Sequence, residues 1–216
     1  MKHFFKNNAF IFLIYFAVIF TAIYFLLSYD KSTIHIYINQ LVGNKIIDAV
    51  FFYITYLGDG AVAPIIVALI LVYNIRLGIY AAVSVIAATL VSTLLKFCFY
   101  DEIMRPAFIF KWYNHTPIKY VVGEHMHIHN SFPSGHSTQA FAIFMCLVFF
   151  TKNNYIKLLF FILALLTAFS RTYLSQHWLV DITVGSIIGT SFSLVFYYIF
   201  LYKKKLSKLN KPLFKK

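Results

Sequence analysis

Long apolar runs separated by short polar segments constrain this chain more than any other feature of its sequence. Charged side chains are scarce in six runs, which cover residues 9–29, 61–75, 78–100, 134–151, 155–174 and 179–202. A helix needs about 20 apolar residues to cross the hydrocarbon core of a bilayer. Hydrophobic residues make up 61% of the chain and charged residues only 12%, a composition that excludes a water-soluble domain. We therefore expect an all-α membrane protein, a bundle of six transmembrane helices.

The segment between the first two runs has a different character. Within the segment 34–57, residues 46–57 are apolar, but they contain Asp48 and end beside a Gly-Asp-Gly turn signal. This pattern predicts one short interfacial helix, which lies on the membrane surface or re-enters it. We see no repeat and no linker elsewhere, so we expect a single domain over 1–216 that ends in a basic cytoplasmic tail at 203–216.

The distribution of charge predicts the orientation of the bundle. The formal net charge is +12, and short cytoplasmic loops are rich in Lys and Arg. With both termini inside, the inner segments contain none of the seven acidic residues and most of the nineteen basic ones, namely Lys2, Lys6, Arg76, Lys152, Lys157 and the lysines of the tail. We expect a multi-pass protein of the inner (plasma) membrane with both termini cytoplasmic. The bases do not alternate with aromatics on a polar face, so nucleic acid is not an expected partner.

A signal peptide is an alternative interpretation of the first run, because Lys2 and Lys6 precede it. The apolar stretch at 9–29 is too long for the hydrophobic region of a signal, and no cleavage site of small residues follows it. We expect this run to remain as a span.

Phe-Pro-Ser-Gly-His-Ser at 132–137 comes directly before the fourth run. The simplest interpretation is a helix start, because Pro is favoured in the first turn and Ser caps it. The exposed N–H groups of a helix start also bind phosphate, and Ser134 and Gly135 would let an anion approach. His136 can then donate a proton. The two interpretations are compatible.

A second group joins the outer ends of the fifth and sixth runs. Ser170-Arg171 is followed after five residues by His177 and, after three more, by Asp181. Arg and His at helix ends commonly extend to the membrane surface without further function. The i, i+4 spacing, however, places His177 and Asp181 on one face if the sixth helix begins at His177. A carboxylate on one ring nitrogen leaves the other with a free lone pair, which makes the imidazole a nucleophile.

Two further cations lie on the same side of the predicted bundle. Lys96 stands at the end of the third run, and Arg105-Pro106 follows it. Either residue alone is ordinary at a span end or in a loop. With Arg171 they make three cations on one side, for which a doubly charged phosphate is the natural ligand.

In this order, Lys … Arg-Pro, Pro-Ser-Gly-His and Ser-Arg-x5-His-x3-Asp in a six-span chain resemble the type 2 phosphatidic acid phosphatase superfamily, which is related to acid phosphatases and vanadium haloperoxidases. The resemblance covers roughly residues 90–185, and the last two motifs match the family pattern at every position. It implies that His177 is the nucleophile that becomes phosphorylated, that Asp181 orients it, and that His136 protonates the leaving group. It also implies that no metal or cofactor takes part, and that the phosphate oxygens are held by Lys96, Arg105, Arg171 and the backbone at Ser134 and Gly135.

One spacing departs from the family pattern. The family usually has six residues between the Lys and the Arg-Pro pair, and here eight intervene, from Phe97 to Met104. Two extra helical residues would turn Lys96 by about 200°, away from the site. Either the residues from Tyr100 to Met104 leave the helix, or Lys96 is not a phosphate ligand.

Alternating histidines precede the Pro-Ser-Gly-His motif, in Glu-His-Met-His-Ile-His at 124–129. On an extended strand His125, His127 and His129 would point the same way and could meet one metal ion. The competing interpretation is a polar loop that contacts the substrate headgroup or nothing.

The expected function is a membrane lipid phosphatase that works through a phosphohistidine. The resemblance does not distinguish a phosphomonoester from a diphosphate. The candidate substrates are undecaprenyl pyrophosphate, phosphatidylglycerol phosphate, phosphatidic acid and the lipid A phosphates. The charge distribution places the site on the periplasmic or exterior side. The alternatives are a lipid phosphotransferase that uses the same residues, and a non-catalytic transporter or scaffold.

Overall fold

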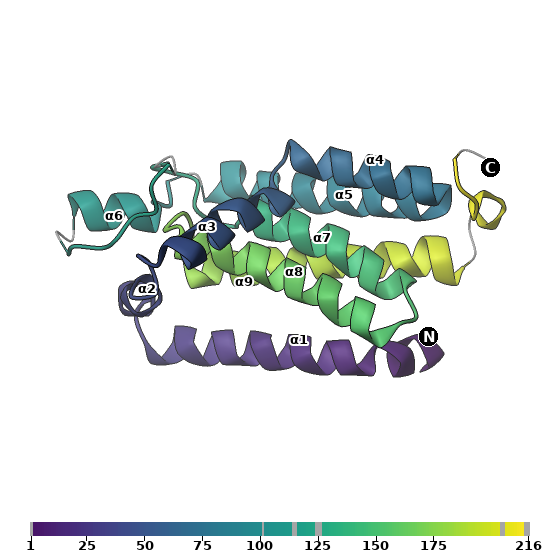
Figure 1. Ribbon diagram of the computed structural model, residues 1–216, viewed down its shortest axis with the longest axis horizontal. Coiled ribbons are helices and arrows are strands. Elements are labelled where there is room, and N and C mark those ends of the chain that lie inside the picture. The colour runs from purple at the N-terminus through teal and green to yellow at the C-terminus, as the bar shows by residue number, and fades with distance from the viewer. Residues whose placement is uncertain (1, 101, 114–115, 124–126, 204–205, 214–216) are drawn as a thin grey trace.

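The computed structural model describes residues 2–100, 102–113, 116–123, 127–203 and 206–213, and the regular elements in this part of the chain are all helical (Figure 1). Four helices are long and apolar enough to cross a bilayer: α1 (Lys2–Ser28), α5 (Ile75–Phe99), α8 (Asn154–Tyr173) and α9 (Leu179–Phe196) with its π-helical continuation η2 (Tyr197–Tyr202). The prediction of an all-α membrane bundle is confirmed.

The predicted span at 61–75 is part of a bent pair. Helix α4 (Val62–Tyr73) has 12 residues and rises only about 18 Å. It follows α3 (Lys45–Ile54) and the 3₁₀ turn η1 (Thr55–Gly58) at an angle of 65°, and the two halves together satisfy the length and hydropathy of one span. The second crossing is therefore a broken helix, and its corner contacts Arg171 and His136.

The segment 34–57 differs from the single interfacial helix that was predicted. It contains α2 (Lys31–Asn39) and α3, separated by a turn at 40–44. Gly43 has a φ of +115°, which residues with a side chain rarely adopt. Asn44 then caps α3 by accepting hydrogen bonds from Ile46 and Ile47. The sequence pattern missed this break because it counted apolar residues and gave no weight to the Gly-Asn pair.

Helix α7 (Gly135–Phe150) lies at the centre of the bundle. It packs against α5, α8 and α9, and most of its side chains are buried. Its 16 residues rise about 24 Å, less than the roughly 30 Å of a bilayer core. In the described part of the chain, four helices meet the criteria for a span, or five if the bent pair is taken as one span. The predicted run at 134–151 is a shorter helix enclosed by the others.

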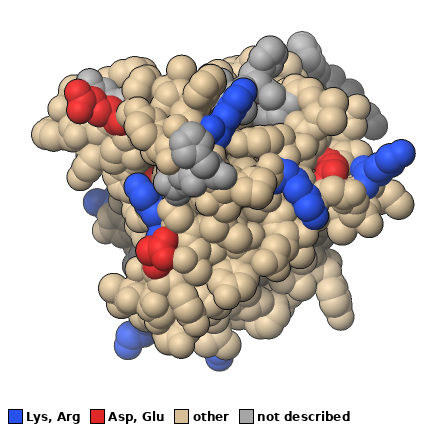
Figure 2. Space-filling view, turned by 90° about the vertical axis from the view of Figure 1, so that its left-hand side faces the viewer, with Lys and Arg blue, Asp and Glu red and all other residues tan. Residues whose placement is uncertain are grey.

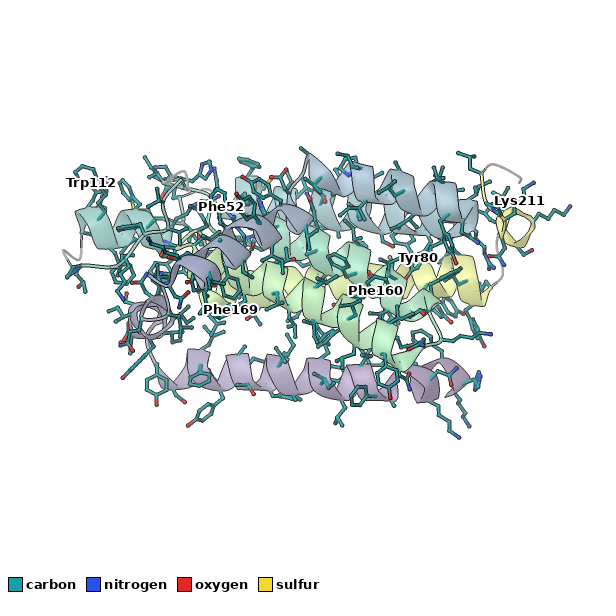
Figure 3. All side chains as sticks on the ribbon, viewed as in Figure 1. Phe52, Tyr80, Trp112, Phe160, Phe169 and Lys211 are labelled. Carbon is teal, nitrogen blue, oxygen red and sulfur yellow. The ribbon has the colours of Figure 1, made fainter. Side chains whose placement is uncertain are left out.

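The two ends of the bundle differ. The N- and C-termini lie at one end, whereas α2 and the short helix α6 (Pro106–Trp112) lie at the other (Figure 1). Trp112 and Lys211 mark these opposite ends in Figure 3. Viewed from the α2–α6 end, side chains of both charge signs are scattered over the surface (Figure 2). The C-terminal segment, which includes η3 (Ser207–Leu209), folds back on the α4–α5 turn, where Lys211 O accepts the N–H of Ile75.

Candidate active site

His177 lies in the loop between α8 and α9. The loop turns back on the end of α8, because the carbonyl of Arg171 accepts the N–H groups of Gln176 (2.9 Å) and His177 (3.1 Å). Ser175 adopts a φ of +57°, which closes this turn. The side chain of His177 is only 2% exposed. Backbone hydrogen bonds therefore fix the position of the imidazole.

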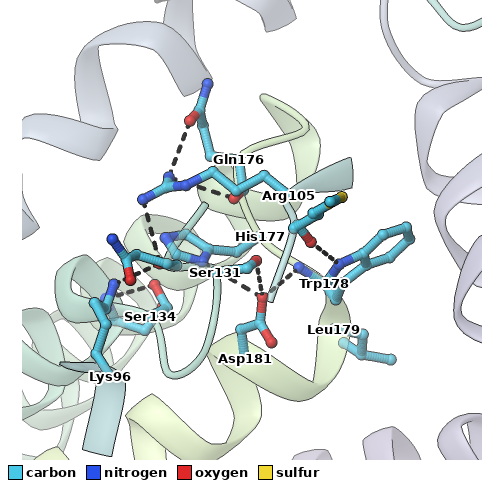
Figure 4. Close-up of polar contacts among 12 residues, drawn as sticks. Lys96, Arg105, Ser131, Ser134, Gln176, His177, Trp178, Leu179 and Asp181 are labelled. Carbon is cyan, nitrogen blue, oxygen red and sulfur yellow. Dashed lines mark hydrogen bonds and ion pairs between the residues drawn. The ribbon is translucent and has the colours of Figure 1, made fainter. Parts of the chain in front are cut away.

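Asp181 stands in the first turn of α9 and faces His177. Its Oδ2 lies 3.5 Å from Nδ1 of His177, and such contacts often tighten when substrate binds. The same oxygen accepts the N–H of Trp178 at 2.9 Å and the hydroxyl of Ser131 (Figure 4). Helix α9 begins at Leu179, two residues after the predicted start at His177, yet the predicted pairing of His177 with Asp181 holds.

The surroundings of His177 favour its neutral form. Burial lowers the pKa of the imidazole well below its ordinary value, and the nearby Arg105, Arg171 and Lys96 lower it further. A ring that is neutral at physiological pH carries a lone pair on one nitrogen. With Nδ1 turned toward Asp181, that lone pair belongs to Nε2.

Ser134 and Gly135 form the start of α7. Ser134 is the N-cap, and its hydroxyl oxygen accepts the N–H of Ser137. Its own N–H donates to the carbonyl of Asp181 at 3.1 Å, which ties the starts of α7 and α9 together. A Cβ built on Gly135 would meet no atom within 4 Å. Internal packing therefore does not require glycine at this position, and the space beside it is open to an anion.

Lys96 and Arg105 converge on one carbonyl. The oxygen of Asn130 accepts hydrogen bonds from Lys96 Nζ (2.8 Å) and Arg105 Nη2 (3.5 Å). Arg105 Nη1 also donates to the side-chain oxygen of Gln176 at 3.1 Å, next to His177 (Figure 4). The third cation, Arg171, donates through Nη1 to the hydroxyl of Thr55 at 2.8 Å.

The structure shows how the longer spacing between Lys96 and Arg105 is accommodated. Helix α5 ends at Phe99, and Tyr100 and 102–105 are not helical. The two additional residues are therefore accommodated outside the helix, and Lys96 keeps its direction toward the site. Asp101 lies outside the described residues.

Further side chains contact the predicted residues without a role assigned from the sequence, and they include Ser131, Gln176, Thr55 and Asp59. Ser131 and Gln176 are direct neighbours of the motifs in the chain. Thr55 and Asp59 come from the corner between η1 and α4, and Asp59 Oδ2 lies 3.5 Å from Nε2 of His136. The only signal for this corner was its Gly-Asp-Gly turn, since the contacts that bring it to the site link residues far apart in the chain.

The proposed cluster of three histidines is only partly described. His125 lies outside the described residues. His129 contributes its carbonyl, which accepts Arg105 Nε at 3.0 Å. His127 is close enough to His136 to interact electrostatically. Among the described residues no group of three or more His, Cys, Asp or Glu side chains is arranged to hold a metal ion.

The arrangement suits a phosphate. Two imidazoles, three cations and the start of a helix face one region, although their positions range from 96 to 181 in the chain. Cations and backbone N–H groups stabilise the oxygens of a phosphate dianion. The neutral imidazole of His177, beside a carboxylate, lies at the same place and carries the lone pair that a nucleophile requires.

The sequence is similar to that of known proteins. The sequence model of the PAP2 superfamily matches residues 77–205. The undecaprenyl-diphosphatase BcrC of Bacillus subtilis is 30% identical over 148 residues, which cover 67% of this chain and 70% of that protein.

Two solved structures share the fold. One is LpxE of Aquifex aeolicus, with a TM-score of 0.66, 23% identity, and coverage of 76% of this chain and 92% of that one. The other is the PAP2-type phosphatidylglycerolphosphate phosphatase of Bacillus subtilis, with a TM-score of 0.61, 20% identity, and coverage of 94% and 98%.

Proposed function

The chain belongs to the PAP2 superfamily and is a membrane-bound phosphatase, and from this premise we propose that it hydrolyses a phosphate ester or diphosphate carried by a membrane lipid, through a phosphohistidine. The observation that carries the proposal is the convergence of His136, the His177–Asp181 pair and three cations at one end of the bundle. All eight residues expected from the sequence contribute to this region.

In the first step, Nε2 of His177 attacks phosphorus and forms a P–N bond. The bond between phosphorus and the leaving oxygen breaks, and that oxygen takes a proton from His136. Lys96, Arg105, Arg171 and the N–H groups at the start of α7 stabilise the charge on the remaining oxygens. Asp181 stabilises the positive charge that develops on His177.

In the second step, water attacks the phosphohistidine. His136, now neutral, accepts a proton from the water as the new P–O bond forms and the P–N bond breaks. Inorganic phosphate leaves, His177 is neutral again, and His136 carries its proton for the next turnover. Every step uses groups of this chain and water, so the proposal needs no metal ion.

A lipid substrate is supported by the apolar groove beside the site. The groove has a volume of about 460 Å³ and is bounded by α4, α5 and α7. Its lining includes Gln139, one turn of helix after His136, and Gly60, next to Asp59. The apolar lining includes Ala63, Val67, Val85, Ile86 and Leu90. A phosphorylated headgroup at the site could extend its hydrocarbon chain along this groove.

Among lipid phosphates we favour a polyprenyl diphosphate, because the curated relative with 30% identity is an undecaprenyl-diphosphatase. We further propose that the site faces the periplasm or exterior and that both termini are cytoplasmic, since the basic residues gather at the terminal end. In a Cys98→Ser background, because Cys98 is exposed, a cysteine introduced at Ser207 should then react with an impermeant thiol reagent only after the membrane is opened.

The test is release of inorganic phosphate by the purified protein from undecaprenyl diphosphate, phosphatidylglycerol phosphate, phosphatidic acid and lipid A. We expect release from at least one lipid, unchanged by a metal chelator. His177→Ala should lower the rate by at least about 10³-fold, because the nucleophile is lost. Normal turnover by His177→Ala would refute the assignment.

Two alternative functions predict other outcomes of the same assay. A phosphotransferase would move phosphate to an added lipid acceptor in preference to water. A transporter or scaffold would bind the lipid and release no phosphate.

A further inference from the structure

Asp59 places a second carboxylate beside a site histidine. Its Oδ2 lies 3.5 Å from Nε2 of His136. The two side chains come from different elements, the η1–α4 corner and the first turn of α7. The geometry repeats that of Asp181 and His177, also separated by 3.5 Å, but through the opposite ring nitrogen: Nδ1 in His177 and Nε2 in His136.

The backbone holds the Asp59 carboxylate in this position. Oδ1 accepts the N–H of Ala61 at 2.8 Å, and the Asp59 carbonyl accepts the N–H of Ala63 at 2.9 Å. The preceding residue, Gly58, lies directly against α7, since a Cβ on it would come within 2.4 Å of the His136 carbonyl. The corner is thus packed on the very turn that carries the imidazole, which leaves Oδ2 to face the ring.

The charges around His136 explain why a neighbouring carboxylate matters for proton transfer. A general acid must carry a transferable proton, but burial and, after it, the neighbouring cations lower the pKa of the His136 imidazole well below its ordinary value. The cationic and titratable groups that act on His136 come from several elements: Lys96 of α5, Arg105 before α6, His127 of the loop, Arg171 of α8 and His177. The Asp181 carboxylate is engaged with Ser131, Trp178 and His177. Asp59 therefore supplies a second negative charge, placed beside His136, which favours the protonated imidazole that a general acid requires.

We propose that Asp59 is a positioning residue that favours the protonated form of His136 and directs its Nδ1 toward the leaving oxygen. The inference rests on the proposed function, in which His136 is the acid. With Nε2–H held by Asp59, the proton on Nδ1 passes to the leaving oxygen in the first step. The ring is then neutral with its lone pair on Nδ1, and it accepts the proton of the attacking water in the second step.

The test compares Asp59→Asn with the wild-type protein in full pH profiles of kcat and KM. Because His136 must begin protonated, activity falls on the alkaline side as that proton is lost. Removal of the carboxylate should move this fall to lower pH by about one unit. We expect kcat at neutral pH to drop about tenfold, KM to change little, and Asp59→Glu to recover part of the loss.

Asp30→Asn is the matched control. Asp30 is an exposed carboxylate at the same end of the molecule, where it caps α2. Its variant should keep the wild-type profile. An unshifted profile in Asp59→Asn, or an equal loss of rate at every pH with a lowered Tm, would overturn the proposal.

A second measurement separates this proposal from the proposed function. In ¹⁵N-histidine NMR, with His136→Gln to assign the signal, the His136 ring should lose its proton at lower pH in Asp59→Asn than in wild type. This readout needs no turnover. If no lipid in the panel is hydrolysed, the proposed function fails; if the NMR titration is the same in both proteins, the role of Asp59 fails.

Discussion

Single residues in this site have two tasks, one structural and one chemical. Asp181 caps the start of α9 through the N–H of Trp178 and also faces His177. Ser134 caps α7 and donates its N–H to the carbonyl of Asp181. The sequence predicted these residues because each belongs to a short motif. It could not predict Thr55 or Asp59, which reach the site through contacts with residues more than seventy positions away.

The two tasks of Asp181 can be separated by substitution. In Asp181→Asn an amide oxygen can still accept the Trp178 N–H, so we expect a Tm close to wild type. The charge that orients and stabilises His177 is lost, and kcat should fall about 10³-fold. Asp181→Ala removes the cap as well and should cost about 1 kcal/mol of stability in addition. Thermal unfolding and phosphate release on the same preparations measure both effects.

One result would contradict the prediction for Asp181→Asn. Wild-type kcat in Asp181→Asn would show that His177 does not depend on this carboxylate. Asp30→Asn, an equivalent change at the cap of α2, should leave kcat unchanged.

At the scale of elements, close approach of α7 and α9 assembles the site. A Cβ on Gly185 would lie 2.7 Å from the Ser134 carbonyl, and one on Gly189 would lie 2.4 Å from the Thr138 carbonyl. The apolar runs predicted both helices. They did not predict which helices touch, nor the corner between η1 and α4, because contact depends on small residues and on packing across the bundle.

Two glycine substitutions distinguish packing from anion binding. Gly185→Ala should force α9 away from α7 and lower stability by about 1–3 kcal/mol. Gly135→Ala meets no neighbouring atom, so Tm should stay within a degree or two. Its methyl group would occupy the space beside the helix start, and displacement of the phosphate should reduce kcat/KM by up to about 10²-fold.

Thermal unfolding and kinetics of the two variants check this contrast. Full activity in a well-folded Gly135→Ala protein would exclude the start of α7 as the phosphate cradle.

At the scale of the whole molecule, the N-terminal helices support the site loop from outside. His35 of α2 is 1% exposed. It stacks on Phe110 with ring centroids 5.3 Å apart, and its Nε2 lies 3.0 Å from the hydroxyl of Ser175. The composition and charge pattern of the sequence predicted a membrane bundle with distinct ends. A buried histidine behind the catalytic loop could not be predicted, since α2 was expected to be part of a longer surface helix.

This histidine makes stability depend on pH. Burial lowers the pKa of His35 from 6.5 to about 4. As pH falls from about 6.5 toward 4, the unfolded chain binds a proton that the folded protein excludes, so folding stability is lost over this window. The loss approaches about 3 kcal/mol at its lower end, because each pKa unit corresponds to about 1.4 kcal/mol. His177, whose pKa is also lowered, adds to this loss of folding stability at low pH.

The measurement is Tm between pH 7.5 and pH 4.5. His35→Phe should reduce the slope, and His3→Gln, at an exposed histidine near the N-terminus, should not. An identical slope in His35→Phe and wild type would contradict this role.

The corner that carries Asp59 lies outside residues 77–205, the part of the chain that the PAP2 sequence model covers. A graft or alignment restricted to the shared motifs would therefore transplant the imidazole of the acid without the carboxylate beside it. A comparison of proton donors between this chain and its relatives therefore has to include the helices ahead of the motif region.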